Sequence, residues 1–305
     1  MKANQVRQTL FPLLAALIWG TAFVAQSVSA DYVQPFTFNA ARSAIAFLVL
    51  LLASVLFRRL KLGEPETENP HYRRDLILGG LCCGSVLTAA TNLQQLGLET
   101  TSSGKAGFIT ALYIVIVPLF GLFLHKKVPG TVWGGVILAM AGLYFLCIKE
   151  AVSISPGDFY ILLCAFCFSA QILLIDHFSG RVRGLELSCA QFLVVTVLSG
   201  GGMLAFEAPT AAGLLHCLWP LLYVGIFSSG VAYTLQILAQ KDSNPTVVSI
   251  LLSLEAVFAA LAGALLLHDK MSGREIFGCV LMLAAVVLTQ LPASGLKRAK
   301  SDAAV

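Results

Sequence analysis

The sequence contains the same pattern twice, and each copy holds five long apolar segments. Residues 122–141 and 265–284 align at an offset of 143 positions, with eight of the twenty positions identical. Further upstream, residues 41–42 align with residues 190–191 at an offset of 149. An odd number of spans per copy forces the second copy into a membrane upside down. Many secondary transporters surround a central site with such inverted repeats.

Composition identifies the membrane as the solvent of this chain. Hydrophobic residues make up 57% of the sequence, charged residues 12%, and the mean hydropathy is +0.83. About 20 apolar residues cross a hydrocarbon core of about 30 Å. Ten segments qualify: residues 9–29, 35–57, 76–97, 102–124, 130–148, 156–177, 186–206, 214–239, 244–267 and 272–291. The sequence therefore predicts an all-α polytopic membrane protein, with two inverted five-helix repeats in residues 1–150 and 151–305.

The distribution of basic residues predicts the orientation. Ten spans place both termini and the even-numbered loops on one side, and fifteen Lys and Arg residues lie there. Only Lys149, Lys270 and Arg274 lie on the other side. The positive-inside rule then predicts cytoplasmic termini, and we expect a bacterial cytoplasmic (inner) membrane protein. This bias accounts for the net charge of +4 without a nucleic-acid partner.

Four sequence motifs resemble those of the EamA-type transporters, a branch of the drug/metabolite transporter superfamily. The motifs are ALIWGTAF at residues 16–23, PFTFNAAR at 35–42, SLEAVF at 253–258, and GKAGFITALY at 104–113. Ala256 departs from the family pattern, which often has proline after the acidic residue. The resemblance covers the whole chain in two copies.

This resemblance implies ten helices in two inverted repeats and the transport of small metabolites, often the export of amino acids or related compounds. We accordingly expect a small-molecule substrate, a lipid bilayer as the surroundings, and a monomer or homodimer. The sequence predicts no cofactor and no metal, since it has neither a P-loop nor an Asp pair spaced for Mg²⁺.

Glu255 is the first candidate for a functional residue. It lies about eleven residues into the ninth expected span, so a rise of 1.5 Å per residue places it close to the midplane. A charge at that depth is costly and usually faces a cavity or a partner. Tyr113 occupies the corresponding position of the first repeat, so we expect a carboxylate and a phenol to meet at a central site. Glu255 is also the candidate for proton coupling; the alternative is a structural glutamate.

Arg42 and Lys105 are the candidate cations of the substrate site. Arg42 lies about 10 Å from the end of its span and keeps its charge, so it needs an anion: Glu255, Glu99 or a substrate carboxylate. Lys105 begins the fourth span, where it either binds an anion or extends its ammonium group to the interface. The second repeat has Gln191 and Val247 at these positions, so the site is chemically asymmetric.

Neutral polar side chains inside the spans complete the candidate site. Interhelical hydrogen bonds explain most such residues. By depth and by repeat position, four are the best candidates for substrate contact: Trp19, Asn92, Gln171 and Tyr233. Trp19 offers a ring face to a planar or cationic group.

An intramembrane enzyme, a lipid flippase and a channel are the alternatives to a transporter. The sequence GIFSSG at residues 225–230 is faintly similar to an intramembrane serine protease, but all five histidines lie at loops or helix ends, so the base is missing. A lipid flippase or a channel on the same fold is the other alternative. A channel would show a continuous polar stripe, whereas the polar residues here cluster by depth.

Overall fold

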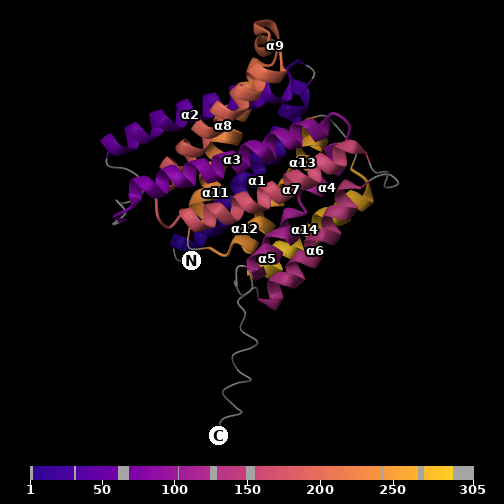
Figure 1. The fold of residues 1–305 in the computed structure, drawn as a ribbon. Helices are drawn as coiled ribbons and strands as arrows, with labels where there is room; N and C mark the ends of the chain where they lie inside the picture. Colours follow the sequence, from indigo (N-terminus) through magenta and orange to yellow (C-terminus); the bar gives the residue numbers. More distant parts are fainter. Residues whose placement is uncertain are drawn as a thin grey trace.

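The computed structural model describes residues 3–30, 32–60, 69–101, 103–123, 129–148, 155–241, 243–266 and 271–290, and it contains no strand among them (Figure 1). The prediction of an all-α protein is confirmed for these residues. Each of the ten expected spans is occupied by helix. The helices of the first half are α1 (Ala3–Ala30), α2 (Pro35–Arg59), α3 (Tyr72–Leu98), α4 (Ser103–Thr110), α5 (Tyr113–Phe123) and α6 (Gly130–Cys147). Those of the second half are α7 (Pro156–Phe178), α8 (Gly184–Phe206), α9 (Ala211–His216), α10 (Leu218–Tyr223), η1 (Val224–Ala232), α11 (Tyr233–Gln240), α12 (Pro245–Leu252), α13 (Glu255–Leu266) and α14 (Gly273–Gln290).

Eight helical segments of the described residues are long and apolar enough to cross a membrane. They run from Pro35–Arg59 to Pro245–Leu265 and include the composite segments Lys105–Phe123 and Leu218–Gln240. Helices α1 and α14, of 28 and 18 residues, coincide with the first and last expected spans. The protein is therefore a multi-pass membrane protein. The count of ten spans, the inversion of the second repeat and its orientation stay predictions.

Helix α1 packs against α10, η1, α11, α12 and α13, and it keeps an exposed stripe that includes Leu10, Leu14 and Leu17 (Figure 1). On one side of it, α2 and α3 pack against α8, and α3 also packs against α7. On the other side, α6 pairs along its length with α14. Every one of these pairs joins the first half of the chain to the second, so the two halves interlock around α1.

Two of the expected spans are broken rather than continuous. The fourth is interrupted at Ala111-Leu112, and the ninth at Ser253-Leu254. Pro118 within α5 lacks the N–H that would bond to the fourth preceding carbonyl, which weakens the fourth span near its break. The ninth span has no proline at the corresponding position. Its Ser253 hydroxyl instead donates to Ile250 O at 2.8 Å, the kind of back-bonding that bends helices. The two breaks are 142 positions apart, which is the offset between Tyr113 and Glu255.

The span over Leu218–Gln240 contains a nine-residue π-helix, η1, that the sequence did not predict. A π-helix frees backbone carbonyls from the usual ladder and is frequent at functional sites. Here the side chains of Ser228 and Ser229 are buried within it. Gly225 packs against Ile45 of α2, which a side chain at position 225 would displace.

Gly20 brings two helices close together beside the centre of the bundle. A Cβ atom at this position would lie 2.6 Å from Phe258 Cβ and 2.8 Å from Glu255 O, both in α13. Only glycine permits this approach of α1 to α13. The Trp19-Gly20 motif therefore has a packing role: the glycine admits α13, and α13 carries Glu255 to the side of Trp19.

Candidate functional site

A cavity of about 50 Å³ lies at the centre of the bundle. Helices from both halves of the chain supply its wall: Trp19, Phe23, Gln26, Arg42, Gln94, Thr110, Tyr113, Phe168, Gln171, Ile172, Ser228, Tyr233, Gln236, Leu252 and Glu255. This volume holds a few water molecules but no metabolite, so a bound solute requires the wall to move. Six of the eight residues predicted as substrate contacts lie in the wall.

The lining follows the sequence repeat closely. Ten of the fifteen residues form five pairs that are separated by 149 or 142 positions: Trp19 with Phe168, Phe23 with Ile172, Gln94 with Gln236, Thr110 with Leu252, and Tyr113 with Glu255. The duplicated sequence thus supplies equivalent positions to opposite walls of one cavity. The remaining five residues, Arg42 and Gln171 among them, have no such partner in the wall.

Glu255 and Tyr113 meet at the breaks in the two discontinuous helices. Each is the first residue of the second half-helix, α13 or α5. The Tyr113 hydroxyl donates to Glu255 Oε1 at 3.5 Å. Among the described residues, no Lys or Arg lies within ion-pair distance of Glu255. The structure therefore brings together the acid and the phenol that the repeat offset paired, with no protein cation to neutralise the carboxylate.

Arg42 extends from α2 into the same cavity and is 6% exposed. Its Nη1 donates to Gln26 Oε1 at 3.1 Å, and its guanidinium lies 5.6 Å from the centre of the Phe38 ring. In the described part of the chain no carboxylate is close enough to form an ion pair with it, so neither Glu255 nor Glu99 is its partner. A buried cation held only by neutral groups is ready for an anion.

Aromatic rings cover another part of the wall. The rings of Trp19 and Tyr233 meet edge to face, with centroids 4.8 Å apart. Trp19 Nε1 donates to Ser228 O in η1 at 3.1 Å. The π-helix thus exposes a carbonyl that fixes the indole, and the indole in turn positions Tyr233.

Gln171 and Gln236 form a buried pair between α7 and α11. Gln236 Nε2 donates to Gln171 Oε1 at 3.3 Å. Both side chains line the cavity, and they are 1% and 2% exposed.

Lys105 and Asn92 lie outside the cavity. Lys105 Nζ pairs with Asp158 Oδ2 at 2.5 Å, and Asp158 also accepts from Thr101 and closes a capping box with Ser155 at the start of α7. Asn92 donates to Ser199 Oγ at 3.0 Å and accepts from Asn39, so it joins α3 to α8 and α2. Both residues tie helices together in this conformation.

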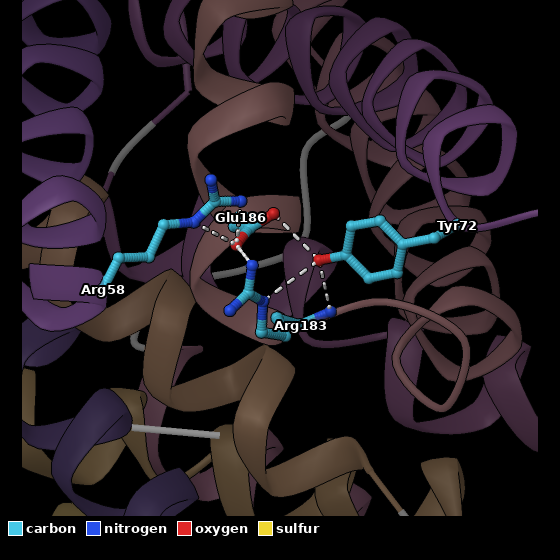
Figure 2. A network of polar contacts seen from close by, with 4 residues as sticks. All are labelled: Arg58, Tyr72, Arg183 and Glu186. Carbon is cyan, nitrogen blue, oxygen red and sulfur yellow. Dashed lines mark hydrogen bonds and ion pairs between the residues drawn. The ribbon is translucent and has the colours of Figure 1, made fainter. Parts of the chain in front are cut away.

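Four residues make a polar network where α2 ends and α3 and α8 begin, and Figure 2 shows it from close by. We call Arg58, Tyr72, Arg183 and Glu186 the basic-end cluster. Glu186 accepts from Arg58 Nη2 at 2.9 Å and from the Tyr72 hydroxyl at 2.8 Å, and it forms an ion pair with Arg183. The Tyr72 hydroxyl in turn accepts from Arg183 N at 3.2 Å. The cluster joins α2, α3 and α8 at this end of the bundle.

A second carboxylate closes the other end of the α2–α8 pair. Glu207, just after α8, accepts from Phe36 N at 2.8 Å, from Thr37 N at 2.6 Å and from Thr37 Oγ1 at 2.7 Å. We call Phe36, Thr37 and Glu207 the opposite-end cluster. The carboxylate satisfies free amides in the first turn of α2, where negative charge is favoured.

Seven of the wall residues that are not among the predicted substrate contacts carry no individual signal in the sequence. Gln26, Gln94, Ser228 and Gln236 are ordinary polar residues of the spans, and Phe168, Ile172 and Leu252 are ordinary apolar ones. The repeat offset was the signal that could have found most of them. Adding 149 to Trp19 and Phe23, or 142 to Gln94 and Thr110, gives four further wall residues.

A bundle of apolar helices around a small polar cavity, with breaks in the helices beside it, is an architecture typical of membrane transporters. The family model of the EamA-like transporter family matches residues 8–148 and again residues 155–291, and the chain belongs to that family.

Similar proteins are also named as transporters. An uncharacterized transporter of Archaeoglobus fulgidus is 30% identical over 283 residues, covering 91% of this chain and 84% of the relative. The uncharacterized transporter YoaV of Bacillus subtilis is 24% identical, covering 93% of this chain and 96% of the relative. A solved crystal structure superposes with a TM-score of 0.75 at 20% identity, over 93% of this chain and 96% of that one, so the two share a fold.

Proposed function

We propose that the protein is a secondary transporter for a small zwitterionic metabolite, an amino acid or a related amphipathic solute, and that it works by alternating access. The observation that carries the proposal is the presence of Arg42 and Glu255 in one cavity wall, each without an oppositely charged protein partner among the described residues. A solute that bears both an anionic and a cationic group supplies what each residue lacks.

The roles of the wall residues follow from their chemistry. Arg42 binds the carboxylate of the solute, and a guanidinium presents a planar fork that matches a carboxylate. Glu255, oriented by Tyr113, binds the ammonium group. Trp19 and Tyr233 cover the apolar part, and their ring faces also attract a cation.

A transport cycle would require the present conformation to change. The cavity is too small for a metabolite, and the basic-end and opposite-end clusters are both formed. Movement at the helix breaks beside Tyr113 and Glu255 would enlarge the cavity toward one side at a time. By the positive-inside bias, the cluster around Glu186 faces the cytoplasm and the termini lie on that side of a bacterial inner membrane.

Flux in proteoliposomes tests the proposal. A panel of labelled amino acids is offered with and without a pH gradient, and we expect at least one to exchange across the membrane. Arg42→Gln and Glu255→Gln should each reduce that flux about tenfold or more, since each removes one charge of the site. The exposed residues Arg59 and Glu99 provide matched controls, and R59Q and E99Q should transport like the wild type.

The same proteoliposomes also test the flippase alternative, proton coupling and the direction of transport. Transport of no member of the panel, together with scrambling of labelled lipid, would favour a flippase and overturn the proposal. Glu255→Gln also tests proton coupling: an unchanged dependence of the residual flux on the pH gradient would show that Glu255 carries no coupled proton. Export is tested by comparing efflux from loaded vesicles with uptake into empty ones.

A further inference from the structure

Two glutamines at equivalent positions of the cavity wall have different hydrogen-bond partners. Gln94 and Gln236 occupy equivalent positions, 142 residues apart, and both line the cavity. Gln94 Nε2 donates to the Thr110 hydroxyl at 3.3 Å. In the second half the position of Thr110 is taken by Leu252, which offers no hydroxyl. Gln236 must therefore find another partner.

That partner is Gln171, a residue that also differs from its counterpart in the first half. The equivalent position of the first half is Ala22, a fully buried residue with no polar side chain. Gln236 Nε2 donates to Gln171 Oε1, and this single bond uses one donor and one acceptor of the pair. Two substitutions between the repeats, at 22/171 and 110/252, have thus replaced one glutamine–threonine contact by a glutamine–glutamine contact.

The pair is left with one unused donor and one unused acceptor. Gln171 Nε2 and Gln236 Oε1 are both buried and have no hydrogen-bond partner in the described part of the protein. Turning both amides over exchanges the labels of oxygen and nitrogen but again leaves one of each. Buried polar groups are rarely left without a partner, and exceptions call for a specific explanation.

We infer that Gln171 and Gln236 form the side-chain subsite of the transporter and select an amino acid that carries a carboxamide. The inference rests on the proposed function, in which Arg42 and Glu255 hold the carboxylate and ammonium groups. A carboxamide has a donor and an acceptor side by side, so it completes both unused groups at once. A carboxylate side chain has no donor, and an aliphatic side chain has neither. When the wall opens, the amides of Gln171 and Gln236 turn toward the solute and bind its side chain.

A competition experiment tests the subsite. Unlabelled glutamine and norleucine, which have side chains of similar length, compete with flux of a labelled amino acid that the wild-type protein transports. We expect glutamine to compete at a concentration about tenfold lower than norleucine. Gln236→Met and Gln171→Met should abolish that preference, so that glutamine and norleucine compete at similar concentrations.

Gln240 provides the matched control, because it lies on α11 one turn from Gln236, donates to Ile172 O at 2.8 Å, and does not line the cavity. Gln240→Met should keep the preference for glutamine. A thermal melt of each purified variant in detergent verifies folding. If Gln236→Met is unstable, Gln236→Asn, which keeps the amide, is the second variant. Its preference for glutamine over norleucine should lie between that of the wild type and no preference.

The outcomes are distinct. If the wild type transports amino acids but glutamine and norleucine compete equally, or if Gln240→Met loses the preference as completely as Gln236→Met, the subsite is wrong and the proposed function stands. If the wild type transports no amino acid at all, both are overturned.

Discussion

The two ends of the α2–α8 pair are closed by carboxylates in different ways. At one end Glu186 binds the cations Arg58 and Arg183 and the phenol of Tyr72. At the other end Glu207 binds the backbone amides and hydroxyl of Phe36 and Thr37. The positions involved are equivalent in the two repeats, since Thr37 and Glu186, like Arg58 and Glu207, are 149 residues apart.

The difference shows how equivalent positions of a duplicated scaffold form unequal contacts at its two ends. Arg58 has a side chain that is 58% exposed, so water and salt reach the basic-end cluster. The opposite-end cluster relies on amides that belong to the helix itself and cannot rotate away. Charge pairs at an exposed end weaken with ionic strength, and short hydrogen bonds from backbone amides to a carboxylate weaken less. We therefore expect the basic end to open more readily.

Loss of the Glu186 carboxylate should have the largest effect. Glu186→Ala removes the anion that pairs with Arg58 and Arg183 and the acceptor of the Tyr72 hydroxyl, which we expect to reduce the free energy of unfolding by about 3 kcal/mol. Equilibrium unfolding in mixed detergent micelles measures the change. Glu186→Gln, which keeps the acceptor oxygen for Tyr72, should lose less. Equal loss in both variants would mean that the hydrogen bond to Tyr72 contributes nothing and that the charge accounts for the whole effect.

Loss of Glu207 should have a smaller effect that depends less on salt. Glu207→Ala removes an acceptor from the first turn of α2, as when a helix cap is deleted, and should cost about 1–2 kcal/mol. Thr37→Val removes only the hydroxyl bond and is the milder control. The measurement is the same unfolding experiment at 50 mM and 1 M NaCl. A salt dependence as steep as that of Glu186→Ala would contradict the distinction between the two ends.

Loss of Arg58 should have the smallest effect and the clearest salt dependence. The exposed side chain contributes at most about 1 kcal/mol, because solvent screens the pair. The deficit of Arg58→Gln should disappear at 1 M NaCl, where the screening length is about 3 Å. Arg59→Gln, at the neighbouring position outside the cluster, should show no deficit at either salt concentration.

The fold and the pair at the centre of the site were predictable from two patterns in the sequence, the long apolar segments and the internal repeat. Apolar segments fix the helices, and the repeat offset pairs Tyr113 with Glu255 before any contact is known. The function of that pair, and the substrate roles of the other candidates, stay predictions. The sequence also contained the pairs Trp19/Phe168 and Gln94/Gln236, which the same offset relates.

Other features depend on details that no offset records. The contact of Lys105 with Asp158 requires α4 and α7 to start side by side, which tertiary packing decides. The breaks at residues 111–112 and 253–254 and the π-helix η1 depend on which backbone carbonyls find other donors. The rotation of an almost uniformly apolar helix about its axis is equally hidden, so composition alone does not assign residues such as Phe23 and Thr110 to the cavity. Their repeat partners Ile172 and Leu252 follow from the offset only once these two are known.

The hydrogen bond from Trp19 to the π-helix gives the protein an optical reporter of its own. The chain has three tryptophans, and the other two, Trp133 in α6 and Trp219 in α10, do not line the cavity. Replacing both by phenylalanine leaves a single indole at the wall, and Trp219 is 80% exposed, so its replacement disturbs little. The emission of that indole shifts with the hydration of its surroundings. Opening of the cavity and arrival of an unlabelled solute then become visible as a change of colour and intensity, in real time and without a radioisotope.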